Sequence, residues 1–198
     1  GQGLADEFEK AATAAGATVV AREYTSDKST DFTAILTSIK GKAADLVFFG
    51  GMDPQGGPMA RQMKRLGLTA QLLGGDGLQN INFIKLAGAD AEGVVASSPG
   101  LPLDAMPGGV EFKQRFEAKY GPIQVYAPYA YDAVEILVAA MRRADSTDPA
   151  KVLAELPKTD HAGVTGPLRF DAKGDTAGGA VTLYQAKGGA WTVLETVK

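Results

Sequence analysis

Short apolar runs alternate with segments of helical periodicity along the first half of the chain, and this alternation constrains the fold more than any other feature. The apolar runs are rich in β-branched and aromatic residues and lie at residues 17–24, 45–50, 69–75 and 93–97. Segments with apolar residues three or four apart lie beside them, at residues 1–15, 29–42, 58–67 and 81–88. Because the runs are continuously apolar, we predict an α/β fold, a parallel sheet with helices on both faces.

The second half of the chain has a different organisation. A stretch rich in Pro and Gly at residues 99–109 has no clear period, and it predicts a crossing between two units. Helical patterns follow, at residues 110–121, 126–144 and 148–157. The chain then ends in two alternating runs joined through Lys187, Gly188 and Gly189, which is typical of an antiparallel hairpin.

Composition excludes several classes of function. The net charge of the 198 residues is −3 and the Lys and Arg residues are scattered, so we expect no nucleic-acid partner. There is no Cys, and His161 is the only His, in a polar loop with no evident acid or base beside it. We therefore expect no catalytic residues, no metal site and no cofactor. An α/β hydrolase remains the more distant alternative, and it would need a nucleophile and a base that the sequence does not show.

Two stretches repeat one arrangement, namely an apolar run that ends at paired glycines and is followed by an acidic residue. In the first, Gly51 precedes Met52 and Asp53; in the second, Gly75 precedes Asp76. Ligands of open parallel sheets bind beyond the carboxyl ends of strands, where both stretches are expected to lie. Glycine permits a positive φ or a close approach to a ligand, and a carboxylate there suits a ligand ammonium group. These five residues are the candidate ligand-binding residues.

Structural interpretations of the same residues remain open. Asp-Gly is a favoured turn pair and Asp often caps a helix, so Asp76 has a purely structural alternative. Asp53 precedes a proline and could initiate the turn into a helix that begins near Pro58. Met52 could fill a gap or line the site of an apolar ligand tail. The loop has no Lys followed by Ser or Thr, which excludes a phosphate-binding loop.

Several motifs in order give a family resemblance that runs essentially along the whole chain. They are the stretch from residue 1 to 51, then RQMKRLGL, GGDG, AEGVV, YAYDAV and TGPLRFDAKGD. In this order and spacing the chain resembles the periplasmic substrate-binding proteins of branched-chain amino-acid ABC transporters. Members of that family have two α/β lobes joined by three crossing strands, and they close around an amino acid in the cleft.

The resemblance implies an organisation and a site. Residues 1–99 and 177–198 match the second ligand-binding lobe, and residues 100–176 match part of the first lobe, so the chain is similar to the later half of a family member. Asp76 falls where the family has the acidic residue that pairs with the ligand ammonium group. Met52 falls where several members have an aromatic residue. The family's Ser and Thr groups for the ligand carboxylate match nothing in this chain.

The resemblance also implies partners and a location. We expect a periplasmic, non-enzymatic binding protein for an aliphatic or branched-chain amino acid or a related small amphiphile, which delivers its ligand to the membrane permease of an ABC transporter. The alternative is a two-lobed ligand-sensing receptor or regulator. The helices within residues 110–156 carry apolar faces that the rest of the first lobe would cover in the family, so we expect them to be mobile, exposed or buried in an oligomer in this chain.

Overall fold

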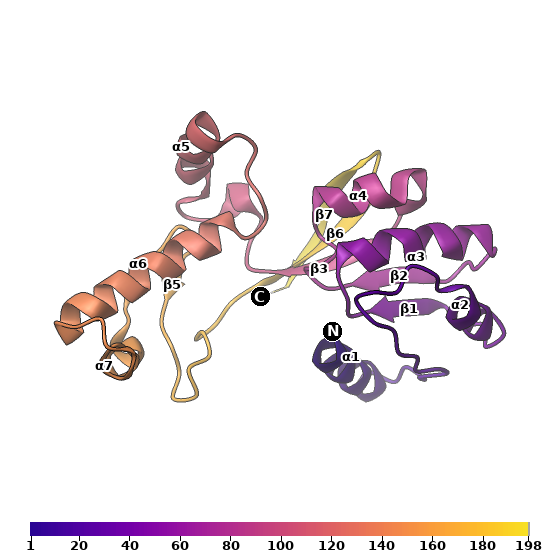
Figure 1. Ribbon diagram of the computed structural model, residues 1–198, viewed down its shortest axis with the longest axis horizontal. Coiled ribbons are helices and arrows are strands. Elements are labelled where there is room, and N and C mark those ends of the chain that lie inside the picture. Colours follow the sequence, from indigo (N-terminus) through magenta and orange to yellow (C-terminus); the bar gives the residue numbers. More distant parts are fainter. Residues whose placement is uncertain (198) are drawn as a thin grey trace. The chain divides into compact units, whose positions relative to one another are not determined.

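The computed structural model describes residues 1–197 and divides them into two compact units. Unit 1 comprises residues 1–98 and 182–197, and unit 2 comprises residues 99–181, so unit 2 is inserted in the sequence of unit 1. Figure 1 shows the sheet of unit 1 with its helices, and the helices of unit 2. The two units are described separately.

Unit 1 is built on five strands in the order β1-β2-β3-β6-β7. Its strands are β1 (Leu46–Phe49), β2 (Gln71–Gly74), β3 (Val95–Pro99), β6 (Val181–Lys187) and β7 (Ala190–Val197). Its helices are α1 (Gln2–Ala14), α2 (Thr33–Lys40), α3 (Asp53–Arg65) and α4 (Ile81–Ala87), followed by a 3₁₀ turn, η1 (Gly88–Ala91). The predicted α/β class is confirmed.

The sheet is parallel where the sequence predicted it and antiparallel at its later edge. β1 pairs with β2 in parallel, with Phe49 opposite Gly74, and β2 pairs with β3 in parallel. The chain turns from β6 into β7 through Gly188 and Gly189 alone, and strands joined by so short a turn are antiparallel. Thr182 of β6 and Thr196 of β7 pair across this hairpin through their hydroxyl groups, 3.1 Å apart.

Helices cover both faces of the sheet. α3 and α4 lie on one face and α1 lies on the other (Figure 1). Alternate residues of β1 face opposite sides, which explains why Phe48 stacks on Phe8 of α1 at a centroid distance of 4.0 Å while Val47 joins the main core. That core lies on the α3 and α4 side, and its largest fully buried apolar side chains are Phe32, Leu36, Leu78 and Phe83.

The strand predicted at residues 17–24 is wrong. The segment forms no ladder with any described residue, and Val19 and Val20 are 44% and 45% exposed. A β-strand is stabilised by hydrogen bonds to a neighbour, so β-branched composition alone does not produce one. β1 has β2 as its only partner in the five-stranded sheet and therefore lies at the sheet edge.

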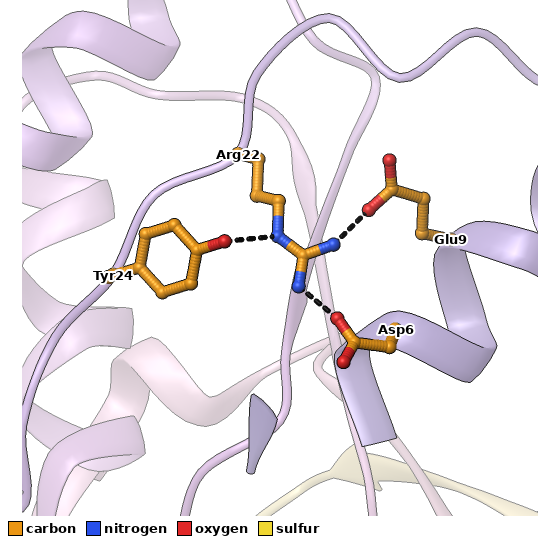
Figure 2. A network of polar contacts seen from close by, with 4 residues as sticks. All are labelled: Asp6, Glu9, Arg22 and Tyr24. Carbon is orange, nitrogen blue, oxygen red and sulfur yellow. Dashed lines mark hydrogen bonds and ion pairs between the residues drawn. The ribbon is translucent and has the colours of Figure 1, made fainter. Parts of the chain in front are cut away.

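Polar contacts hold residues 17–24 against α1 instead. Figure 2 shows the guanidinium group of Arg22 between the carboxylates of Asp6 and Glu9, with the Tyr24 hydroxyl accepting from Nε at 2.9 Å. The hydrogen bond to Asp6, followed by that to Tyr24, raises the pKa of Arg22 above its ordinary value. Arg22 therefore stays charged at any pH at which the chain is folded.

Two helix starts differ from the sequence prediction. α2 begins at Thr33 rather than next to Ser29 or Thr30, and the carboxylate of Asp31 accepts the Thr33 N–H at 2.9 Å. α3 begins at Asp53, five residues before the expected start at Pro58. The Met52 carbonyl accepts the Gly56 N–H at 2.9 Å, so a first turn forms before Pro58 is reached.

Unit 2 is mainly helical. Its helices are α5 (Gly109–Tyr120), α6 (Ala127–Ala144) and α7 (Pro149–Glu155), with 3₁₀ turns η2 (Leu103–Ala105) and η3 (Leu156–Lys158). Two short antiparallel strands, β4 (His161–Ala162) and β5 (Pro167–Leu168), follow, so His161 lies in a strand and not in a free loop.

The buried face of α6 carries a carboxylate that organises the loop between β4 and β5. Asp132 is 2% exposed and accepts hydrogen bonds from the N–H groups of Val164 and Thr165, each at 2.8 Å, and from the Thr165 hydroxyl at 2.6 Å. Ile136 and Ala140, one and two turns further along α6, are buried on the same face. This face joins α6 to the loop.

The opposite face of α6 is apolar and exposed. Tyr131, Val134, Leu137 and Val138 are between 37% and 58% exposed, at the spacing of one helical stripe. The exposure predicted for the helices of this region is therefore observed.

Candidate functional site: the paired-glycine loops of unit 1

The two repeated stretches lie side by side in the structure. Because β1 and β2 are parallel and in register, the loops that follow them leave the sheet at the same edge. The N–H of Asp53 donates to the carbonyl oxygen of Gly77 at 2.9 Å and joins the two loops directly. Residues 50–53 and 75–78 are called the paired-glycine loops below.

A buried leucine explains one of the paired glycines. Leu78 is fully buried although it lies in a turn, where the Gly75 carbonyl accepts its N–H at 3.0 Å. A Cβ atom at Gly74 or at Gly56 would overlap the Leu78 side chain. The bare backbones of β2 and α3 therefore make room for Leu78, which packs the second loop against both elements.

The other glycines of the loops also meet protein atoms closely. A Cβ atom at Gly51 would overlap the ring of Phe49, and one at Gly75 would lie 2.5 Å from Cδ2 of Leu4 in α1. Neither glycine has a positive φ. The positive-φ alternative for these residues is therefore wrong, and the close approach that they permit is to Phe49 and Leu4.

Met52 and Asp76 lie beside the same glycine. Gly77 follows Asp76 in the chain, and a Cβ atom there would lie 2.7 Å from Sδ of Met52 and 2.8 Å from the carbonyl oxygen of Gly51. The Met52 thioether thus covers the backbone next to Asp76 while the residue remains 52% exposed. The exposed thioether thus lies against the backbone next to an acidic residue, and an apolar group near an acidic residue suits a small amphiphilic cation.

The two acidic residues differ in their positions. Asp76 is half-buried and opens the turn after β2, and its carbonyl oxygen accepts the Gln79 N–H at 3.0 Å. Asp53 is the first residue of α3, where a carboxylate is stabilised by the positive end of the helix dipole. The helix start gives Asp53 the structural role that the sequence left open, and the structure brings both residues to one edge.

Sequence reasoning missed two residues that build the site. Leu78 and Gly77 position the second loop without being candidates themselves. The available signal was an apolar residue inside an otherwise polar, glycine-rich turn, which indicates a buried anchor.

A cavity of about 290 Å³ lies elsewhere in unit 1. Glu92 and Ala91 line it at the amino end of β3, with Ile84 and Ala186, so it lies away from the carboxyl ends of β1 and β2. The Glu92 carboxylate accepts the Gly188 N–H at 2.9 Å and fastens the β6–β7 turn there. Within residues 1–197, no three His, Cys, Asp or Glu side chains are grouped to hold a metal ion.

A mixed sheet with helices on both faces, and with two adjacent loops at the carboxyl ends of its parallel strands, matches the fold of the type I periplasmic binding proteins. The sequence pattern of the family described as "Periplasmic binding protein" matches residues 1–190, and the chain belongs to this family. The family is one of binding proteins and not of enzymes, which removes the support for the hydrolase alternative. Membership implies an extracytoplasmic location, and none of the described helices is long and apolar enough to cross a membrane.

Among proteins of similar sequence, the Leu/Ile/Val-binding protein BraC3 of Rhizobium johnstonii is 33% identical over 197 residues, which cover 98% of this chain and 53% of that protein. The leucine-, isoleucine-, valine-, threonine-, and alanine-binding protein of Pseudomonas aeruginosa is 32% identical over 186 residues, covering 93% of this chain and 50% of that protein. The chain thus spans about half the length of the curated relatives it matches.

Solved structures give the same result. The leucine-binding protein LivK of Thermotoga maritima has a TM-score of 0.89 and 26% identity, over 98% of this chain and 56% of that one. LivJ of Streptococcus pneumoniae, solved in complex with isoleucine, has a TM-score of 0.76 and 27% identity, over 90% of this chain and 51% of that one. The family resemblance and the fold class predicted from the sequence are confirmed.

Proposed function

We propose that this chain is part of the solute-binding component of an amino-acid ABC importer, which binds an aliphatic or branched-chain amino acid or a related small amphiphile. The observation that carries the proposal is the placement of Asp76 and Met52 beside Gly77 at one sheet edge. The names of relatives that bind leucine, isoleucine and valine, and the isoleucine complex of LivJ, support the ligand class.

In this proposal the groups of the paired-glycine loops divide the ligand between them. Asp76 accepts hydrogen bonds from the ligand ammonium group, and Met52 contacts the aliphatic side chain through its flexible thioether. Asp53 adds negative charge at the same edge, and the backbones of Gly51 and Gly75 form the surface against which the ligand lies. A cationic group of the ligand is favoured here because the charged side chains of the paired-glycine loops, Asp53 and Asp76, are both acidic.

The proposed units have distinct roles. Residues 1–99 and 177–198, within which unit 1 lies, supply the second ligand-binding lobe, and residues 100–176, which lie within unit 2, form part of the first lobe. If both lobes contact the ligand only in the closed state, the ligand binds that state more tightly than the open one. Binding then stabilises closure, since a ligand shifts an equilibrium only by the difference in its affinity for the two states. The groups that bind the ligand carboxylate in the family have no counterpart in residues 1–198, so other residues of the whole protein would supply them.

Calorimetric titration of the whole protein with L-leucine tests the assignment. Asp76→Asn removes the negative charge with little change in shape, and we expect affinity to fall roughly 10- to 150-fold, the equivalent of a hydrogen bond to a charged group. Asp90→Asn is the matched control, because Asp90 lies in η1, before the amino end of β3 and away from the paired-glycine loops. The affinity of this variant for L-leucine should stay unchanged. Unaltered binding by Asp76→Asn, or no binding of any aliphatic amino acid by the unmodified protein, would reject the proposal.

We further propose that the whole protein works in the periplasm and delivers its ligand to the membrane permease of an ABC transporter. The family match supports this partner, as does LivJ, which is described as a branched-chain amino acid transporter substrate binding protein. Uptake of labelled L-leucine into cells that lack the gene, compared with cells that carry it, measures delivery. Equal uptake in both would contradict the importer role while leaving ligand binding intact.

A further inference from the structure

The chain crosses between the two units at sites that are close together on the unit 2 side. It leaves unit 1 after Ser98 and returns to it after Val181. Within unit 2 the N–H of Gly100 donates to the carbonyl oxygen of Ala180 at 2.6 Å. The outgoing and returning segments are therefore hydrogen-bonded to each other before either enters unit 1.

A tyrosine of α6 holds the outgoing segment. The Tyr129 hydroxyl donates to the carbonyl oxygen of Pro99 at 2.5 Å. Gly100 has a φ of +82°, and a Cβ atom there would overlap the Tyr129 hydroxyl oxygen and lie 3.3 and 3.4 Å from two ring carbons. The tyrosine thus requires a bare backbone at Gly100, and it contacts both residues of the crossing.

The region of α6 that carries Tyr129 is itself fixed. Asp132 lies three residues further along, so the two side chains project from neighbouring positions of one face. The Asp132 carboxylate is buried and binds the loop at Val164 and Thr165 through three hydrogen bonds. One turn of α6 therefore anchors two separate segments of unit 2.

We propose that Tyr129 is a positioning residue: its hydroxyl fixes to α6 the crossing segments, which continue the neighbouring strands β3 and β6, and so restrains rotation between the units. With the Pro99 carbonyl and the Gly100–Ala180 pair held to α6, the crossing segments cannot swing freely against that helix. The hydroxyl group of Tyr129 then sets the range of orientations that the units sample. Only the coupling of that range to amino-acid binding rests on the proposed function.

A distance measurement between the units tests the anchor directly. None of the 198 residues is Cys, so Lys64→Cys in α3 and Gln114→Cys in α5 give one exposed spin-label site in each unit. The whole protein is used, with any cysteine outside these residues replaced by serine. We expect Tyr129→Phe to broaden the distribution of label distances measured by double electron–electron resonance.

Amide hydrogen exchange gives a local readout of the same anchor. We expect the Gly100 N–H to exchange about fivefold faster in Tyr129→Phe, the effect of losing one hydrogen bond of ordinary strength from a locally opening segment. Tyr131→Phe is the matched control, since Tyr131 is two residues away on α6 and no hydrogen bond from its hydroxyl is found within residues 1–197. Both readouts should be unchanged in the control.

Gly100→Ala and a ligand titration complete the test. The alanine should broaden the distance distribution, and less so when Tyr129 is already Phe, because the overlap with the hydroxyl oxygen is then gone while the strain of alanine at a φ of +82° remains. A lower melting temperature of Tyr129→Phe with an unchanged distance distribution would overturn the proposal, as would equal effects of Tyr131→Phe. If L-leucine does not narrow the distance distribution of the unmodified protein, the proposed function is contradicted. The effect of Tyr129→Phe in the absence of ligand would still show whether Tyr129 anchors the crossing segments.

Discussion

The main-chain N–H of Asp53 and the carbonyl oxygen of Gly77 are 2.9 Å apart, and this hydrogen bond joins the loop after β1 to the loop after β2. It places the first residue of α3 next to the turn that contains Asp76. Gly77 is the common element, since Met52 packs over its backbone. The candidate site therefore depends on one glycine that has no ligand-binding group of its own.

Gly77→Ala should loosen the paired-glycine loops. The new methyl group would lie 2.7 Å from Sδ of Met52 and 2.8 Å from the Gly51 carbonyl oxygen, so the first loop must shift. We expect a loss of roughly 1 to 3 kcal/mol in the free energy of unfolding, as for other overpacked sites, together with weaker L-leucine binding. Urea denaturation and calorimetry measure the two effects.

Gly3→Ala is the control for that substitution. A Cβ atom at Gly3 has no neighbour within 4 Å, and the residue lies within α1. Alanine is favoured over glycine inside helices, so the control should gain up to about 1 kcal/mol in stability. A Gly77→Ala protein as stable as the unmodified chain would show that the loops are not tightly packed there.

Asp132→Asn should destabilise unit 2. The buried carboxylate accepts from two N–H groups and the Thr165 hydroxyl, whereas an amide replaces one acceptor oxygen with a donor. Hydrogen bonds to charged groups contribute about 1.5 to 3 kcal/mol, and we expect a loss of that size in urea denaturation. Glu135→Gln on the exposed surface of α6 should change stability by less than about 0.5 kcal/mol. Equal stability of the two variants would contradict the anchoring role.

Asp160 should titrate below the ordinary aspartate range. Arg169 donates from Nε and Nη2 to its two carboxylate oxygens, both at 2.9 Å, and these hydrogen bonds, followed by the positive charge, lower the pKa of Asp160. Because the folded pKa is the lower one, the stabilisation is present above the unfolded pKa and is lost as pH falls through the folded value. Both side chains are exposed, so the contribution to stability is small.

Carbon-13 NMR of the Asp160 carboxyl group measures this shift. In Arg169→Gln the pKa should rise towards the ordinary value of 3.8. Arg115→Gln removes a positive charge from α5 instead and should leave the titration of Asp160 unaltered. If Arg169→Gln and the unmodified chain titrate alike, the ion pair is not formed in solution.

We predict that the 198-residue chain self-associates through the exposed stripe of α6, which is one of the alternatives that the sequence left open for these helices. Leu137→Glu introduces a charge into that stripe and should shift the chain towards the monomer in multi-angle light scattering. Ala133→Glu places the same charge at an exposed position of α6 outside the stripe, and should have little effect. A compact monomer at all concentrations for the unmodified chain would refute association.

The strands whose partners are consecutive in the sequence were predictable. β1, β2 and β3 lie where continuous apolar runs predicted them, and the glycines at 188 and 189 marked the hairpin. Residues 17–24 have equally suitable β-branched residues but no neighbouring strand among the described residues. Periodicity reports which face a side chain prefers, and it cannot report whether a hydrogen-bonding partner is present.

The candidate site was predictable in part. The prediction that both glycine pairs follow neighbouring parallel strands is confirmed, because strands joined through helices run parallel and their carboxyl ends share one edge. The start of α3 was predicted too late. Proline favours the first turn of a helix, so Pro58 suggested a helix start, whereas in the structure it lies inside the helix. The contact of Leu78 with Gly56 and that of Tyr129 with Gly100 could not be predicted, because each joins residues that are far apart in the sequence.

The arrangement of the sheet has a consequence for biosynthesis. β6 lies next to β3 in the sheet although the whole of unit 2 separates them in the chain. During translation the inserted helices leave the ribosome before the last two strands of unit 1, so they can pack locally while the sheet still has an open edge at β3. Completion of the sheet then awaits β6 and β7, so a stop codon in the hairpin would damage unit 1 more than unit 2.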